Sequence, residues 1–101
     1  MLPACEISRR AQSDLREIAD YSIEQWNEEQ AERYIDELEE CFLLLALQPN
    51  LGRVSPAIRE GLRRHEHGRH VIFYIEIAGG IRIQRVLHQR TLPLKRKFLE
   101  L

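Results

Sequence analysis

The spacing of apolar residues changes once along this 101-residue chain, and the change limits the folds that the chain can adopt. Between residues 8 and 48 apolar side chains recur about every 3.6 residues, as on one face of an α-helix. Between residues 61 and 90 they alternate along the chain, as in β-strands. A chain of this length builds one core. The pattern therefore predicts a single α+β domain over residues 1–101, with helices before a small sheet.

The helical part contains two start signals. Ser8 precedes the first apolar stripe and can cap a helix, directly after a short predicted strand at Ala4–Ile7. Asn27 can cap a second helix, with Gln30 at the third helical position, as in a capping box. The apolar stripe restarts there in a different phase after a short connection. We therefore expect two helices packed as an antiparallel hairpin.

Proline and glycine separate the helical part from the strands. Pro49 ends the second helix, Gly52 is expected to adopt positive φ, and residues 53–60 read as an irregular linker. Residues 71–77 are apolar on both faces, which predicts a central strand, and Gly79-Gly80 predicts a two-residue turn of the primed type. In the strand that follows, alternation places Ile81, Ile83 and Leu87 on one face and Arg82, Gln84 and His88 on the other.

Charge is divided unevenly between the two halves of the chain. Residues 1–50 carry 4 Arg against 12 Asp and Glu, a net charge of -8, and residues 51–101 carry 11 Lys and Arg against 4 Glu, a net charge of +7. Two interpretations remain open. The halves neutralise each other within the fold, or the basic half faces an anionic partner.

The two cysteines and the apolar runs bear on the cellular compartment. Cys5 and Cys41 lie in apolar surroundings without metal-ligand spacing, as expected of buried thiols in a reducing compartment. There is no signal-like leader, and no apolar run approaches the ~18 residues that a membrane span needs. We expect a soluble cytoplasmic protein that makes no contact with a membrane.

Histidines suggest two kinds of chemistry. His65 and His67 would share one side of a strand, with His70 nearby, but nothing supplies the further ligands that zinc needs, so we expect no metal and no cofactor. His88 could carry a proton in RNA cleavage. The arginines that could bind phosphate in that reaction are Arg63, Arg69, Arg82, Arg85 and Arg90. Alternation places Arg82 and His88 on one face and Arg85 on the other, and a binding surface without chemistry is the third alternative.

Six sequence fragments in a fixed order resemble the ParE toxins of bacterial toxin-antitoxin modules. The resemblance runs from about Ile7 to Arg90. The fragments are Leu15-Arg16-Glu17-Ile18-Ala19-Asp20-Tyr21, Gln30-Ala31-Glu32-Arg33-Tyr34, Pro49-Asn50-Leu51-Gly52-Arg53, Glu60-Gly61-Leu62-Arg63-Arg64, Gly68-Arg69-His70-Val71-Ile72-Phe73-Tyr74 and Arg85-Val86-Leu87-His88-Gln89-Arg90.

The resemblance implies a RelE-like fold in the order β-α-α-β-β-β. It also implies a non-enzymatic toxin that inhibits DNA gyrase and is neutralised by a ParD-type ribbon-helix-helix antitoxin, which links the toxin indirectly to promoter DNA. Related toxins with this fold cleave mRNA on the ribosome, often with a late tyrosine or histidine, but no tyrosine here lies beyond Tyr74. Such an endonuclease, with His88 and Arg82 as its catalytic residues, is the alternative, and a degenerate relative that binds antitoxin without toxicity is another.

Two surfaces are predicted in that framework. The antitoxin is expected to contact apolar residues of the hairpin and basic strand residues, namely Leu15, Ile18, Trp26, Tyr34, Leu38, Arg63, Arg64 and Arg69. Gyrase is expected to face the basic end of the chain, namely Arg85, His88, Arg90, Lys95, Arg96 and Lys97.

Overall fold

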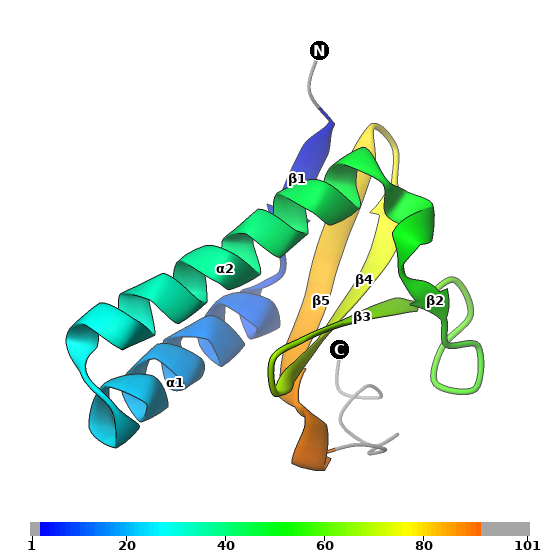
Figure 1. The fold of residues 1–101 in the computed structure, drawn as a ribbon. Helices are drawn as coiled ribbons and strands as arrows, with labels where there is room; N and C mark the ends of the chain where they lie inside the picture. The colour runs from blue at the N-terminus through cyan, green and yellow to red at the C-terminus, as the bar shows by residue number, and fades with distance from the viewer. Residues whose placement is uncertain (1–2, 92–101) are drawn as a thin grey trace.

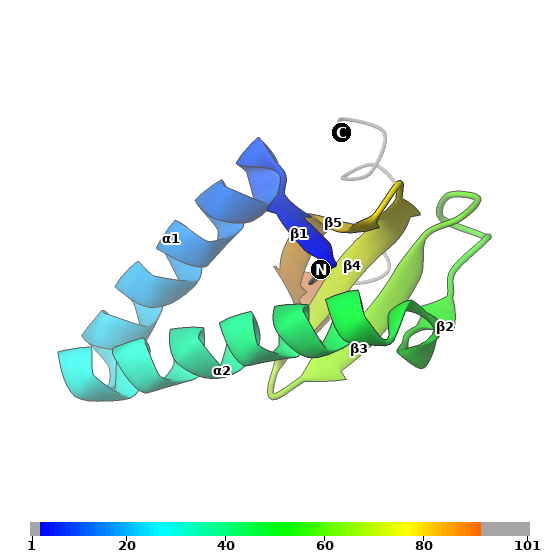
Figure 2. The same ribbon diagram turned by 90° about the horizontal axis from the view of Figure 1, so that it is seen from above.

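The computed structural model describes residues 3–91 and places a helical hairpin on one face of a five-stranded sheet (Figure 1). The α+β prediction is therefore confirmed. Figure 2 shows the two helices meeting at their connection and diverging from it. The elements are β1 (Ala4–Ile7), α1 (Arg9–Gln25), α2 (Glu28–Leu47), the 3-10 turn η1 (Pro49–Leu51), β2 (Arg53–Val54), β3 (Arg63–His67), β4 (His70–Ile77), β5 (Gly80–His88) and a second 3-10 turn, η2 (Gln89–Thr91).

Both helices begin at the predicted caps. The Ser8 hydroxyl accepts a hydrogen bond from the backbone N–H of Ala11 at 3.1 Å, and the Asn27 side chain accepts one from Gln30 at 2.8 Å. Each cap satisfies a backbone donor that the first turn of a helix leaves without an intrahelical partner. The Ser8 hydroxyl also donates to the carbonyl oxygen of Gln84, so the start of α1 is tied to β5.

The sheet has the order β1-β5-β4-β3-β2, with β4 in the centre as predicted. Only the β1–β5 pair is parallel, and the other pairs are antiparallel. A Cβ atom at Gly80 would collide with the Ala4 carbonyl oxygen, so glycine permits the close approach of β1. The linker prediction for residues 53–60 is wrong at its start, because Arg53 and Val54 pair with β3.

Because β5 contains a β-bulge, the predicted assignment of its side chains to the two faces of the sheet is wrong. Tyr74 pairs with Ile83, whereas the neighbouring Phe73 pairs with Arg85, so Gln84 is an extra residue in β5. The inserted residue reverses the alternation beyond it. Val86 therefore joins Ile81 and Ile83 under the helices, and Leu87 packs with Phe73 on the opposite face.

The two faces of the sheet bury separate apolar clusters. The larger one lies beneath the helices, and the smaller one lies beneath the loop that contains Ile58. The larger cluster contains Ala11, Ile18, Leu38, Phe42, Leu45, Ala46, Ile72, Tyr74, Ile81, Ile83 and Val86, and the smaller contains Leu62, Val71, Phe73 and Leu87.

Two glycine predictions are wrong in detail. Gly52 has a φ of -75°, and its lack of a side chain instead makes room for the buried Tyr74 hydroxyl, which accepts a hydrogen bond from the Gly52 N–H at 2.8 Å. The β4–β5 turn consists of residues 78 and 79, and only its second residue, Gly79, has positive φ. Primed turns need positive φ at the first central residue, so this turn is not one of them.

Candidate partner-binding surfaces

A buried ion pair fixes α1 against β5. The Asp14 carboxylate accepts hydrogen bonds from Nε and from a terminal nitrogen of Arg85, each at 2.9 Å, and from the backbone N–H of Val86 at 2.9 Å. Both side chains of the pair are 9% exposed. Sequence reasoning missed Asp14, although its spacing from Ala11 and Ile18 places a carboxylate on the buried stripe of α1.

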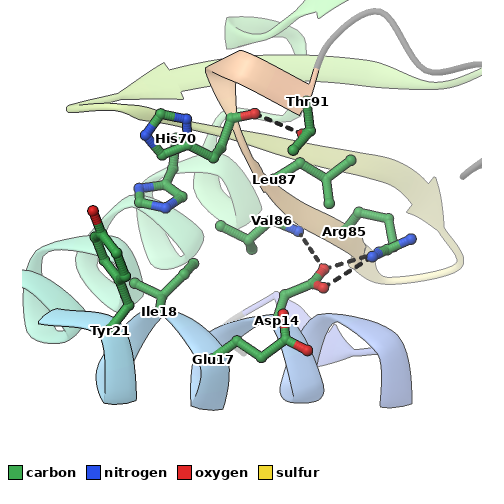
Figure 3. A pocket seen from close by; sticks show the side chains of 10 residues that line it. Asp14, Glu17, Ile18, Tyr21, His70, Arg85, Val86, Leu87 and Thr91 are labelled. Atoms are coloured by element: carbon green, nitrogen blue, oxygen red, sulfur yellow. Dashed lines mark hydrogen bonds and ion pairs between the residues drawn. The ribbon is translucent and has the colours of Figure 1, made fainter. Parts of the chain in front are cut away.

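A groove of about 290 Å³ lies beside this pair, between α1 and the adjoining ends of β4 and β5 (Figure 3). Ile18 and Tyr21 line it from the helix, and His70 and His88 line it from the strands. The two imidazole rings meet edge to face, with their centroids 5.3 Å apart. The groove therefore has a mixed lining: the helix side adds the carboxylates of Asp14 and Glu17 to Ile18 and Tyr21, and the strand side combines the histidine rings with apolar side chains.

A hydrogen-bonded network connects α2 with the turn between β3 and β4. The Tyr34 hydroxyl lies 2.6 Å from Nδ1 of His70 and 3.3 Å from the carbonyl oxygen of His67. The Glu37 carboxylate lies 3.0 Å from Nε2 of His67. Burial, with smaller contributions from the imidazoles of His88 and His67, lowers the pKa of His70 to about 4, so His70 is neutral near pH 7.

The connected ends of the helices expose three large apolar side chains. Tyr21, Ile23 and Trp26 are 58%, 45% and 52% exposed. Trp26 also lines a shallow hollow with Tyr34. We call Tyr21, Ile23 and Trp26 the hairpin tip. Tyr21 and Ile23 are two positions apart on α1 and point to different sides of the helix, so the tip exposes apolar surface in more than one direction. Exposed apolar side chains gathered at one end of a folded domain are typical of interaction surfaces.

Two of the three arginines predicted to bind antitoxin make hydrogen bonds inside the domain. Arg63 donates to the Gly52 carbonyl oxygen at 2.7 Å, and Arg64 donates to the Glu66 carboxylate at 3.2 Å. Arg69 is exposed in the turn between β3 and β4, near Tyr34. The three arginines thus lie toward the two ends of a five-residue strand, and only Arg69 lies beside the helical hairpin.

The apolar residues predicted to bind antitoxin divide between core and surface. Leu38 is fully buried and Ile18 is 8% exposed, while Leu15 is half-buried against the core. Trp26 is exposed and Tyr34 is half-buried next to the His67–His70 turn. The structure therefore brings Trp26, Tyr34 and Arg69 toward one side and assigns Leu38 to the core.

The residues predicted to face gyrase or to catalyse RNA cleavage are also separated. Arg85 is buried in the pair with Asp14, which removes it from the exposed surface, while Arg90 is exposed and His88 half-buried. The bulge turns His88 toward His70 and the helices, while Arg82 pairs with Glu6 at 2.8 Å on the opposite face. The prediction that Arg82 and His88 share a face is thus wrong. Lys95, Arg96 and Lys97 lie outside the described residues.

The described residues, 3–91, offer neither a metal site nor a membrane-spanning helix. These residues contain no group of three or more His, Cys, Asp or Glu side chains that could hold a metal ion, and His65 and His67 lie in no such group. None of the described helices has the length and apolarity needed to cross a membrane.

Comparison with known proteins decides the family. The model of the family described as "ParE toxin of type II toxin-antitoxin system, parDE" matches residues 5–93. The chain belongs to the ParE toxin family. Toxin ParE1 of Caulobacter vibrioides is 41% identical over 83 residues, which cover 82% of this chain and 85% of that toxin. Toxin ParE1 of Mycobacterium tuberculosis is 40% identical over 85 residues, covering 83% and 87%.

A solved structure shares the ParE fold. A chain described as "Chromosomal ParDE TA system from P. aeruginosa" superimposes with a TM-score of 0.74 and 21% identity, and covers 86% of this chain and 96% of its own. This likeness concerns the fold: a helical hairpin followed by a mixed sheet. The family match over residues 5–93, and not this likeness, places the chain among the ParE toxins of type II toxin-antitoxin systems.

Proposed function

We propose that this chain is a toxin that arrests growth by inhibiting DNA gyrase, and that a ParD-type antitoxin neutralises it. The observation that carries the proposal is the family match over residues 5–93, with about 40% identity to two ParE1 toxins. The toxin acts without catalysis, in the cytoplasm where gyrase is found, and reaches promoter DNA only through the antitoxin. No cofactor or metal takes part.

The hairpin tip and the neighbouring groove form the proposed antitoxin surface. Trp26 and Tyr21 supply exposed aromatic rings, and aromatic anchors carry much of the binding energy at protein interfaces. Arg69 adds positive charge near Tyr34. A fitting antitoxin segment is amphipathic, with an apolar stripe for the tip and acidic residues for Arg69, because complementary charge accelerates encounter.

Antitoxin binding tests this assignment. Trp26→Glu is expected to weaken binding of the cognate antitoxin by at least about tenfold, since truncating an interface hot spot costs about 2 kcal/mol or more. Arg69→Glu is expected to slow association and to reduce its salt dependence. Leu47→Glu, at the far end of α2, is the matched control and should bind as the wild type does. Unchanged binding by Trp26→Glu would remove the tip from the antitoxin surface.

Gyrase inhibition is proposed to use the basic end of the chain, with His88 and Arg90 followed by Lys95, Arg96 and Lys97. Purified toxin is expected to inhibit supercoiling by gyrase, and added antitoxin should restore it. A charge-reversed variant of Lys95, Arg96 and Lys97 should lose inhibition while retaining antitoxin binding. Loss of both activities would indicate that these residues support the fold instead.

The endonuclease alternative needs His88 and Arg82 at one site. They lie six positions apart on β5 and on opposite faces, and six residues of strand span roughly 20 Å. Translating ribosomes with a reporter mRNA provide the test, and we expect no cleavage by the wild-type chain. Fragments that disappear with His88→Ala, together with unaffected gyrase, would overturn the proposal. A chain that binds antitoxin but fails to arrest growth would be a degenerate toxin.

A further inference from the structure

A second exposed apolar surface lies at the end of α2. It consists of five side chains, each 40% to 62% exposed, which we call the leucine strip: Leu43, Leu44, Leu47, Leu51 and Val54. Isolated exposed apolar side chains are common, but five within residues 43–54 provide apolar surface of the kind that mediates association. The strip contains no residue of the proposed antitoxin or gyrase surfaces.

The strip is outward-facing because α2 turns a different face to the sheet. Leu38, Phe42 and Leu45 of α2 are buried against the sheet, and the helical period places Leu43 and Leu47 on the other side. The chain then folds back, because the N–H of Gln48 bonds to the Leu44 carbonyl and the N–H of Leu51 to the Gln48 carbonyl. This turn packs η1, which contains Leu51, against the end of α2.

Opposite charges flank the two ends of the strip. Glu39 and Glu40 are exposed one turn before Leu43. At the other end Leu51 lines a hollow together with Arg53, Arg64 and Glu66. Two arginines share the single Glu66 carboxylate there, at 2.7 and 3.2 Å, which leaves a net charge of +1. The strip thus runs from an acidic end to a basic end.

We propose that the leucine strip binds a second copy of this chain, in a twofold-symmetric dimer with its axis near Leu47. In an antiparallel arrangement about this axis, Leu47 packs against Leu47 of the second copy, and Leu43 packs against Leu51 of the second copy. The same symmetry places Glu40 opposite Arg53 of the second copy, twice per dimer. A twofold interface must be complementary to itself, and a strip with an acidic and a basic end meets that requirement.

The dimer does not depend on the proposed toxin mechanism. The hairpin tip lies at the other end of α2, and a 20-residue helix is about 30 Å long (Figure 1). Each copy in the dimer therefore keeps its hairpin tip accessible. An antitoxin bound at the tip and a second toxin bound at the strip are compatible on one molecule.

Sedimentation velocity of the purified full-length chain over a wide concentration range tests the proposal. The wild type is expected to show a reversible monomer–dimer equilibrium. Leu47→Glu is expected to weaken it by at least about a hundredfold, because each substitution acts twice in a symmetric dimer. Trp26→Glu is the matched control and should dimerise as the wild type does. A wild type that stays monomeric, or a Leu47→Glu variant that still dimerises, would refute the interface.

A charge exchange distinguishes this dimer from any other use of the strip. Glu40→Arg and Arg53→Glu should each weaken dimerisation, and the double variant should restore it, because every pair across the axis is again of opposite charge. Failure of the double variant to recover would contradict the twofold arrangement. If the wild type were monomeric and Leu47→Glu lost antitoxin binding, the strip would belong to the antitoxin and the proposal would be wrong.

Discussion

Removing the Asp14 carboxylate should destabilise the fold more than any change to an exposed ion pair. Asp14 lies in α1 and accepts three hydrogen bonds of 2.9 Å from β5, two of them from Arg85 and one from the backbone of Val86. In Asp14→Ala the buried Arg85 guanidinium loses this carboxylate. The Val86 N–H loses its acceptor at the same time.

The buried contacts of Asp14 set the expected loss of unfolding free energy. Breaking a buried ion pair by removing one partner costs about 3–5 kcal/mol, and a buried backbone N–H without an acceptor adds about 1 kcal/mol or more. Domains of this size have a free energy of unfolding of about 5–15 kcal/mol, so Asp14→Ala should lose about a quarter or more of it. The double variant Asp14→Leu/Arg85→Met should recover much of the loss, because both charges are then absent from the interior.

Urea denaturation of the single and double variants measures these differences as a double-mutant cycle. Glu29→Ala is the control, because the Arg33–Glu29 contact at 3.5 Å joins two largely exposed side chains and should change stability by no more than about 0.5 kcal/mol. A loss below about 1 kcal/mol for Asp14→Ala would refute the reasoning. Equal destabilisation of the single and double variants would do the same.

Three further predictions concern the glycine contact, the buried tyrosine and a histidine. Gly80→Ala should lower the free energy of unfolding by about 1–3 kcal/mol, because the added Cβ atom would collide with the Ala4 carbonyl oxygen. An unchanged urea midpoint would contradict this. Tyr74→Phe should lower the free energy of unfolding by about 1–3 kcal/mol, because the lost hydroxyl accepts a hydrogen bond from Gly52 and donates one to the Pro49 carbonyl oxygen at 2.7 Å. An unchanged free energy of unfolding would mean that water replaces the hydroxyl. His70 binds its proton with a pKa of about 4 when folded and about 6.5 when unfolded, so stability should fall as pH drops through that interval. His70→Gln should flatten the pH profile, and an unaltered slope would exclude His70 as its source.

Several elements were predictable because their signals are local. Ser8 and Asn27 mark helix starts by offering a side-chain oxygen to a donor three residues later, and both bonds are present. Apolar residues on both faces of residues 71–77 indicated a central strand, and β4 occupies that place. The sequence pointed to Arg63 and Arg64 as basic residues of the candidate site. It did not reveal that Arg63 donates to the Gly52 carbonyl oxygen and Arg64 to the Glu66 carboxylate.

The bulge at Gln84 could not be predicted from local sequence patterns. The alternation of residues in β5 does not indicate the extra residue, which lies where Ser8, the N-cap of α1, and Asp14 of α1 hydrogen-bond to the strand. The bulge separates His88 from Arg82 and turns it toward His70. The Tyr34–His70 contact likewise joins residues 36 positions apart, beyond the reach of any periodicity.

By itself the sequence determined the element types, the helix starts and the family, because propensity, capping and apolar period act between residues a few positions apart. Only the tertiary structure decided which charges are buried, which strand face each side chain of β5 occupies, and which apolar residues stay exposed. Those outcomes depend on register and packing between distant segments. Asp14 and Arg85, 71 positions apart, became one buried pair, whereas Leu47 remained on the surface.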